Sequence, residues 1–238
     1  MKNKWVWYVG FFVLLFAGYF VFVLSQTDIS QSNLPVINNN VQSFSFTDQN
    51  GKKITEKDVE GKVYVAEFFF TTCKGICPKM NANMRRVFDE FKTDSNFMII
   101  SHTCMPETDS APLLKKYETK MLNGNLKKNE DGSYKIEYDS TMDKPAAANS
   151  NWYFVTGDKK QLYDMARHSY LIDNNKTADT LSNIADQFIH TQLFALVDKQ
   201  TRLRGMVYDG LKGDEIEKLI KDIKGLLKEK YQNRALNN

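Results

Sequence analysis

The sequence predicts an α/β domain, a central mixed β-sheet flanked by helices, behind one N-terminal transmembrane helix. Two observations predict the domain: short β-branched and aromatic runs alternate with helical apolar patterns, and no internal repeat is apparent. A third predicts the transmembrane helix, because residues 5–24 contain no charged side chain and about 20 apolar residues cross a bilayer. We expect an anchor at 1–24, a tether at 25–42 and a domain at 43–232.

The charges around the apolar segment predict its orientation. Lys2 and Lys4 precede it, and Asp28 is the first charge after it, so the basic flank places the N-terminus in the cytoplasm. A cleavable signal peptide is the alternative, but its apolar region is usually shorter and ends at a small-residue cleavage site. We therefore expect an uncleaved, single-pass anchor in the inner membrane, with the domain on the outer or periplasmic side.

The overall composition argues against several classes of protein. The chain is 42% hydrophobic and 26% charged, as in an ordinary globular domain, and five prolines and 12 glycines do not fit a collagen-like chain. Of 32 basic residues two precede the apolar segment, and 29 acidic residues almost balance the others. A nucleic-acid binder usually has a basic excess or a basic face, so no nucleic-acid partner is expected.

The apolar patterns predict the elements of the domain. Phe44 and Phe46 alternate with polar residues before Asn50-Gly51, which indicates a hairpin. The run at 63–70 (VYVAEFFF) is typical of a strand buried on both faces. The other expected elements are a helix from Pro78 with an apolar stripe of Met80, Met84, Val87, Phe88 and Phe91, a strand at 96–101, a helix from Asp109 or Ser110 to about Met121, a surface insertion at about 123–150 with one candidate strand at 133–138, a strand at 151–155, a helix at 158–168, strands at 191–197 and 202–207, and a helix at about 214–230 with Ile216, Leu219, Ile220, Ile223 and Leu227 on one face.

The segment TTCKGICPKM at 71–80 carries the chemistry. Cys73 and Cys77 follow a buried strand at the mouth of a helix, which is the arrangement of thioredoxin-like folds, and Cys77 lies where the helix dipole favours a thiolate. Gly75 permits the tight turn between them. Three intervening residues leave room for an ion between the sulfurs without forbidding a disulfide, so a structural disulfide is the alternative. Two thiolates suit copper, and an imidazole would extend the site to both Cu(I) and Cu(II).

His190 is the best candidate for a third ligand. It directly precedes the strand at 191–197, and in a thioredoxin-like fold the loop before this strand lies beside the thiol pair. His168 ends a predicted helix, where a cation is mildly favourable and no function is required. His102 closes a buried strand and is placed near the same rim.

Cys104 and Met105 follow His102 in a loop that is expected to open on the same side of the sheet as Cys73. Soft sulfur there could assist copper capture or form a disulfide with the pair. The alternative is a buried thiol and a methionine that fills a gap.

With these residues the sequence resembles the Sco/SenC family, membrane-tethered proteins implicated in assembly of the copper A centre of cytochrome c oxidase. The resemblance covers about residues 41–225. It implies that Cys73, Cys77 and His190 bind copper, that the fold is thioredoxin-like, and that the partner is the copper A subunit. It rests on EFFFTTCKGICPKM at 67–80, SHT-x-x-PE-x-DS at 101–110, NWYFVTGD at 151–158 and FIHTQLFALVDKQTRLRGMVYDG at 188–210.

The chain departs from this family at one position of the loop at 101–110. Many members carry an aspartate directly before the loop proline, where this chain has Met105 with Cys104 before it. No role of that aspartate can therefore be carried over to this chain.

Three functions are compatible with the motif. The leading interpretation is a metallochaperone that passes copper to the oxidase subunit. The first alternative is an enzyme, a thiol–disulfide oxidoreductase that keeps the oxidase's copper-ligand cysteines reduced, with Cys73 attacking and Cys77 resolving. The second is a sensor of copper or redox state. A dedicated reductase needs no histidine at position 190 and a three-ligand copper site does, so His190 favours metal binding.

Overall fold

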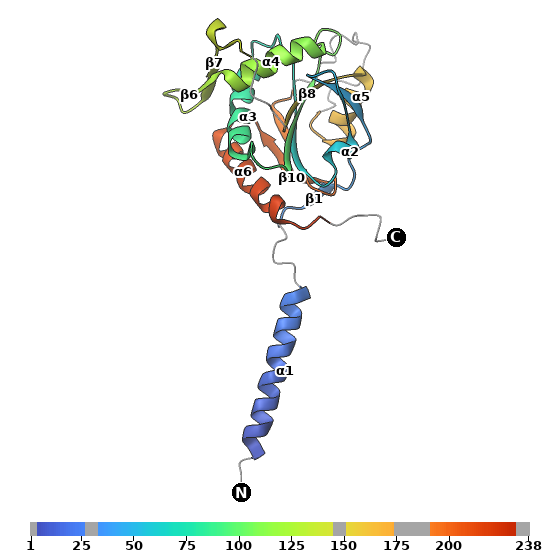
Figure 1. Ribbon diagram of the computed structural model, residues 1–238, viewed down its shortest axis with the longest axis vertical. Coiled ribbons are helices and arrows are strands. Elements are labelled where there is room, and N and C mark those ends of the chain that lie inside the picture. The colour runs from blue at the N-terminus through green and yellow to red at the C-terminus, as the bar shows by residue number, and fades with distance from the viewer. Residues whose placement is uncertain (1–3, 27–32, 145–150, 174–190, 232–238) are drawn as a thin grey trace.

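The computed structural model describes residues 4–26, 33–144, 151–173 and 191–231, and Figure 1 shows their arrangement. Helix α1 (Lys4–Gln26) contains the apolar segment. Within the described ranges it is the one helix that is long and apolar enough to cross a membrane, and none of its candidate span, Lys4–Phe22, is buried in the protein. The predicted N-terminal helix is therefore confirmed as a helix.

An eight-stranded mixed sheet forms the centre of the domain. Strands β4 (Val63–Phe69) and β5 (Phe97–Thr103) are parallel neighbours and are buried along their whole length. Strand β8 continues the parallel part beside β5, and β9 runs antiparallel on the other side of β4. The order is β1-β10-β9-β4-β5-β8-β2-β3, with β1 (Val36–Asn38), β2 (Ser45–Asp48), β3 (Lys53–Thr55), β8 (Trp152–Thr156), β9 (Leu193–Val197) and β10 (Leu203–Asp209).

Helices cover both faces of this sheet (Figure 1) and so enclose two apolar cores. The first core includes the predicted stripe of the helix that begins at Cys77, and all five of its residues are buried. The predicted sheet with flanking helices is thus confirmed. The first face carries α3 (Cys77–Phe91), α4 (Ala111–Asn123) and α6 (Gly213–Lys228), and the second carries α2 (Glu56–Val59), α5 (Lys159–Asp164) and the π-helix η2 (Met165–Ser169).

Two segments contain more strands than the sequence predicts. Val36–Asn38, inside the expected tether, forms β1 and pairs with β10 at the edge of the sheet. The insertion contains a hairpin of β6 (Asn125–Lys128) and β7 (Tyr134–Glu137), where a single strand was expected, followed by the short helix η1 (Ser140–Met142). Strand β7 confirms the candidate strand at 133–138, whereas β1 and β6 were not predicted, because three or four residues are too few to show a clear apolar alternation.

Two helices also differ in detail from the prediction. The helix expected at 158–168 ends at Asp164 and continues as the π-helix η2. In α6, Leu226 is buried, whereas Leu227 is only partly buried. The apolar pattern of α6 contains both residues, so packing against the sheet decides which of them faces the core.

Candidate metal centre

The thiol pair lies in the loop that joins β4 to α3. Strand β4 ends at Phe69, and the N–H of Cys73 donates to the carbonyl of Phe70 at 3.2 Å, so the chain turns before the first thiol. Helix α3 begins at Cys77 with Pro78 in its first turn, where the fixed φ of proline suits the helix. The structure therefore brings both cysteines to the same end of the sheet.

The two thiols are in contact and are not joined by a disulfide. Cys73 is half-buried and Cys77 is 4% exposed, and the Cys73 side chain lies close enough to influence the Cys77 thiol. Burial raises the pKa of the Cys77 thiol and the Cys73 side chain raises it further, while a backbone hydrogen bond from Phe70 lowers it. The expectation that the helix N-terminus favours a thiolate at Cys77 is wrong for the free pair, because desolvation outweighs the dipole. A thiolate here needs a cation beside it.

Asp109 fastens this loop to its neighbour. Its carboxylate accepts hydrogen bonds from the Thr71 N–H at 3.2 Å and the Thr71 hydroxyl at 2.5 Å, and a further one from the Thr103 hydroxyl. The Met105 N–H in turn donates to the Thr103 hydroxyl at 2.9 Å. Asp109 or Ser110 was expected to cap the following helix, and the N-cap of α4 is Ser110. Asp109 accepts these hydrogen bonds because the loop after β4 lies beside the loop after β5, an arrangement that the sequence alone does not show.

Cys104 and Met105 lie in this neighbouring loop, as expected. The N–H of Cys104 donates to the carbonyl of Phe69 at 2.8 Å, so the loop opens beside the end of β4. The Cys104 side chain is buried and belongs to the second core, whereas Cys77 belongs to the first. No disulfide links Cys104 to either of the other two cysteines.

His102 lies in the second core and not at the rim, so its predicted position is wrong. Its ring stacks on Phe68 at 4.8 Å between centroids and contacts Phe46 and Tyr170 edge-on. Strand alternation explains the error, because residue 102 points to the face opposite α3. Burial lowers the pKa of His102 to about 4, so its ring is neutral at physiological pH.

His190 lies outside the described residues, and its role as a ligand stays a prediction. The strand that follows it, β9, runs antiparallel to β4 with Ala195 opposite Ala66. The beginning of β9 therefore lies beside the end of β4, where the thiol loop starts. Across the described ranges no cluster of three His, Cys, Asp or Glu residues could hold a metal ion.

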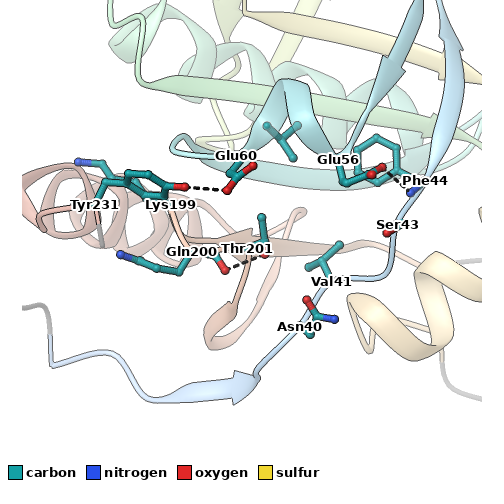
Figure 2. Close-up of a pocket in the computed structure, with 11 residues that line it drawn as sticks. Asn40, Val41, Ser43, Phe44, Glu56, Glu60, Lys199, Gln200, Thr201 and Tyr231 are labelled. Carbon is teal, nitrogen blue, oxygen red and sulfur yellow. Dashed lines mark hydrogen bonds between the residues drawn. The ribbon is translucent and has the colours of Figure 1, made fainter. Parts of the chain in front are cut away.

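A pocket of about 190 Å³ lies at the opposite end of the sheet (Figure 2). Glu60 at its wall precedes β4, whereas Cys73 follows it. The Tyr231 hydroxyl donates to Glu60 at 2.7 Å, and Lys199 donates to the carbonyls of Leu227 and Glu229 at the end of α6. These polar groups are hydrogen-bonded within this end of the domain. Because Glu60 and Cys73 lie at opposite ends of β4, the pocket is separate from the thiol site.

Comparison with known proteins shows which family the chain is similar to. The sequence profile of the SCO1/SenC family matches residues 36–127, which include the thiol loop and Asp109. The SCO1 protein homolog of Bacillus subtilis (strain 168) is 27% identical over 190 residues, which cover 79% of this chain and 83% of that protein. The chain is therefore similar to the SCO1/SenC family, with the profile match over residues 36–127.

Solved structures of Sco proteins share the fold. BsSco, a member of the Sco family of cytochrome c oxidase assembly proteins in which a disulfide switch was identified, aligns with a TM-score of 0.58 and 26% identity. The alignment covers 82% of this chain and 98% of BsSco. ScoI of Bradyrhizobium japonicum, solved with copper bound, aligns with a TM-score of 0.50 over 79% of this chain and 99% of ScoI, and its 19% identity makes this a likeness of fold alone. The predicted thioredoxin-like fold is confirmed.

Proposed function

We propose that this protein binds copper through Cys73, Cys77 and His190 and delivers it to the copper A subunit of cytochrome c oxidase. The observation that carries the proposal is the pair of free neighbouring thiols, Cys73 in the loop before α3 and Cys77 at the first residue of α3. Paired thiols form a soft ligand set, and a neutral imidazole completes a three-coordinate site for Cu(I) that also accepts Cu(II).

The environment of the pair favours a bound cation. The Cys77 thiol is buried and hard to ionise alone, and a buried negative charge is costly unless it is paired or coordinates a metal. A copper ion supplies that compensation. Similarity to the SCO1/SenC family, to a cytochrome c oxidase assembly protein and to a putative copper-binding protein supports copper as the metal.

The exposure of the site suits transfer of an ion to a partner. Cys73 is half-buried and Cys77 is covered, so an incoming ligand from the recipient reaches the ion from the Cys73 side. The hydrogen bonds from Thr71 to Asp109 hold the loop in place meanwhile. Helix α1 anchors the protein in the inner membrane, with the domain on the outer or periplasmic side and close to a membrane-bound oxidase.

Copper binding by the full chain in detergent tests the proposal. The reduced protein is loaded with Cu(I) or Cu(II), and copper stoichiometry and the sulfur-to-copper charge-transfer absorption are compared in wild type, Cys73→Ser, Cys77→Ser and His190→Ala. One copper per chain (about one equivalent) is expected in wild type, with the absorption lost in both cysteine variants and altered in His190→Ala. Cys104→Ser is the matched control and should keep the wild-type spectrum.

Thiol–disulfide exchange is the second candidate function, and the contact between Cys73 and Cys77 favours it, because neighbouring thiols can close to a disulfide without a large movement. The half-exposed Cys73 would attack a partner disulfide, and the buried Cys77 would resolve the mixed disulfide. Absence of stable copper binding, together with reduction of a partner disulfide that is unchanged in His190→Ala, would replace the chaperone proposal with this one.

A further inference from the structure

A buried carboxyl group lies in the same core as the thiol pair. Glu67 is in the middle of β4, and its side chain is fully buried. Alternation along the strand points it to the same face as Val65 and Phe69, whose side chains share the first core with Cys77. The run VYVAEFFF at 63–70 contains one charged residue, a signal that sequence analysis did not use.

The hydrogen bonding of Glu67 is incomplete. Its Oε1 atom accepts a hydrogen bond from the Ser101 hydroxyl at 2.5 Å, and the Ser101 oxygen accepts one from the Trp152 ring N–H at 2.9 Å. Its Oε2 atom has no hydrogen-bond partner in the part of the chain that the structure describes. No cation forms an ion pair with it there, whereas the buried Asp198 pairs with two arginines and the buried Glu118 with Lys115.

Titratable groups from two helices share this interior with Glu67. Cys77 comes from α3 and Tyr117 from α4, and the Asn81 side chain donates to the Cys77 carbonyl at 2.9 Å and to the Tyr117 hydroxyl at 3.1 Å. Burial raises the pKa of Tyr117, and the fields of Cys77 and Glu67 raise it further. Glu67 likewise contributes to the raised pKa of Cys77, after burial and Cys73. A negative charge on Glu67 therefore raises the pKa of Cys77 and Tyr117, and one on Cys77 raises the pKa of Tyr117.

A lone buried carboxyl with an unpartnered oxygen destabilises a core when it is ionised. Burial raises the pKa of Glu67 to about 7, and the Ser101 hydrogen bond opposes part of that shift. Glu67 is thus poised between its two forms near physiological pH, and a small change in local charge changes its protonation.

We propose that Glu67 takes up a proton when the thiol pair becomes a metal-bound thiolate pair, and releases it when the ion leaves. Two thiols that bind Cu(I) give up two protons and leave the two thiolates and the ion with one net negative charge. A carboxylate in the same interior would add a second. When Glu67 takes up one of the two protons, this second negative charge is neutralised. The other proton enters the solvent, and no electron is transferred. The inference rests on the proposed copper binding.

Proton release during Cu(I) titration tests this role. The reduced full chain is titrated with Cu(I) in weakly buffered detergent solution, and released protons are counted with a pH indicator. Near pH 8, Glu67→Gln should release about one proton more per copper than wild type. Near pH 5, where Glu67 already carries its proton, the two should release the same number. Glu118→Gln, which removes a buried carboxyl bonded to Gln49 and Lys115, should behave like wild type.

A second measurement needs no variant. In the infrared spectrum of wild type near pH 8, the C=O stretch of a protonated carboxyl should grow on Cu(I) loading. Equal proton release by wild type and Glu67→Gln near pH 8, or an unchanged carboxyl band, would overturn the role of Glu67 while copper binding stands. Failure of wild type to take up Cu(I) would overturn both this inference and the proposed function.

Discussion

Single polar residues inside the sheet distinguish this domain from a purely apolar core. His102 and Glu67 lie on adjacent strands, with the His102 Nδ1 atom 3.3 Å from the Glu67 carbonyl oxygen, and point to opposite faces. His102 packs among aromatic rings, whereas Glu67 shares its core with the thiol pair. Burial raises the pKa of Glu67 and lowers the pKa of His102, because it favours the neutral form of each side chain.

The buried His102 ring predicts a loss of stability in acid. Its pKa is about 4 in the folded protein against 6.5 for the exposed side chain. The unfolded chain therefore binds an extra proton as the pH falls below about 6.5, and the free energy of unfolding decreases until about pH 4, by about 3 kcal/mol. His102→Phe, which keeps a ring beside Phe68, should remove this loss. Urea unfolding at several pH values measures the difference, and an identical acid dependence in wild type and variant would contradict it.

Asp109 predicts a link between loop order and thiol reactivity. Asp109→Ala leaves the buried donors of Thr71 and Thr103 without their acceptor, which should cost about 3 kcal/mol of stability. It should also speed alkylation of Cys73 in the folded protein, because the loop loses its anchor. Glu107→Gln changes an exposed residue of the same loop and should leave both quantities almost unchanged. Equal alkylation rates in the three proteins would show that Asp109 does not position the thiol loop.

The long apolar patterns of the sequence were sufficient to locate the main strands and helices. The sequence did not show which residues of different elements lie side by side. The buried run of β4 and the stripe of α3 are both long, so their positions follow from the sequence. The placement of Cys73 and Cys77 between them follows as well. Asp109 gains a distant partner in Thr71, which follows β4, and Glu67 gains one in Ser101 of β5. The side to which His102 points depends on strand register, and the edge strand β1 is too short to give a pattern.

Strand β1 predicts that the domain begins before residue 43. The Asn38 side chain donates to the carbonyls of His168 at 2.8 Å and Ser169 at 3.1 Å, in the π-helix η2. Asn38→Ala should therefore lower the free energy of unfolding by about 1 kcal/mol. The exposed Asn40, changed to alanine, should alter it by less than about 0.5 kcal/mol. An effect of Asn38→Ala no larger than that of Asn40→Ala would make residues 33–40 a tether, as the sequence first suggested.

For the whole molecule, the N-terminus and the thiol site should lie on opposite sides of the membrane. α1 is apolar with basic residues on its N-terminal side only, so the domain should face outward. Protease added to spheroplasts should degrade the domain while a cytoplasmic marker survives, and alkaline carbonate should not extract the full chain. Exchanging Lys2 and Lys4 for glutamine should reduce the digestible fraction. A domain that resists protease until the membrane is broken would contradict this orientation.

The proposed copper ligands are Cys73, Cys77 and His190, and X-ray absorption at the copper edge distinguishes this ligand set from others. The Cu(I)-loaded full chain should show two sulfur neighbours and one imidazole nitrogen, and the nitrogen should disappear in His190→Ala while both sulfurs remain. Cys104→Ser should leave the spectrum unchanged, since its thiol lies in the other core. A site with three sulfur neighbours, or one that keeps its imidazole in His190→Ala, would contradict this ligand set.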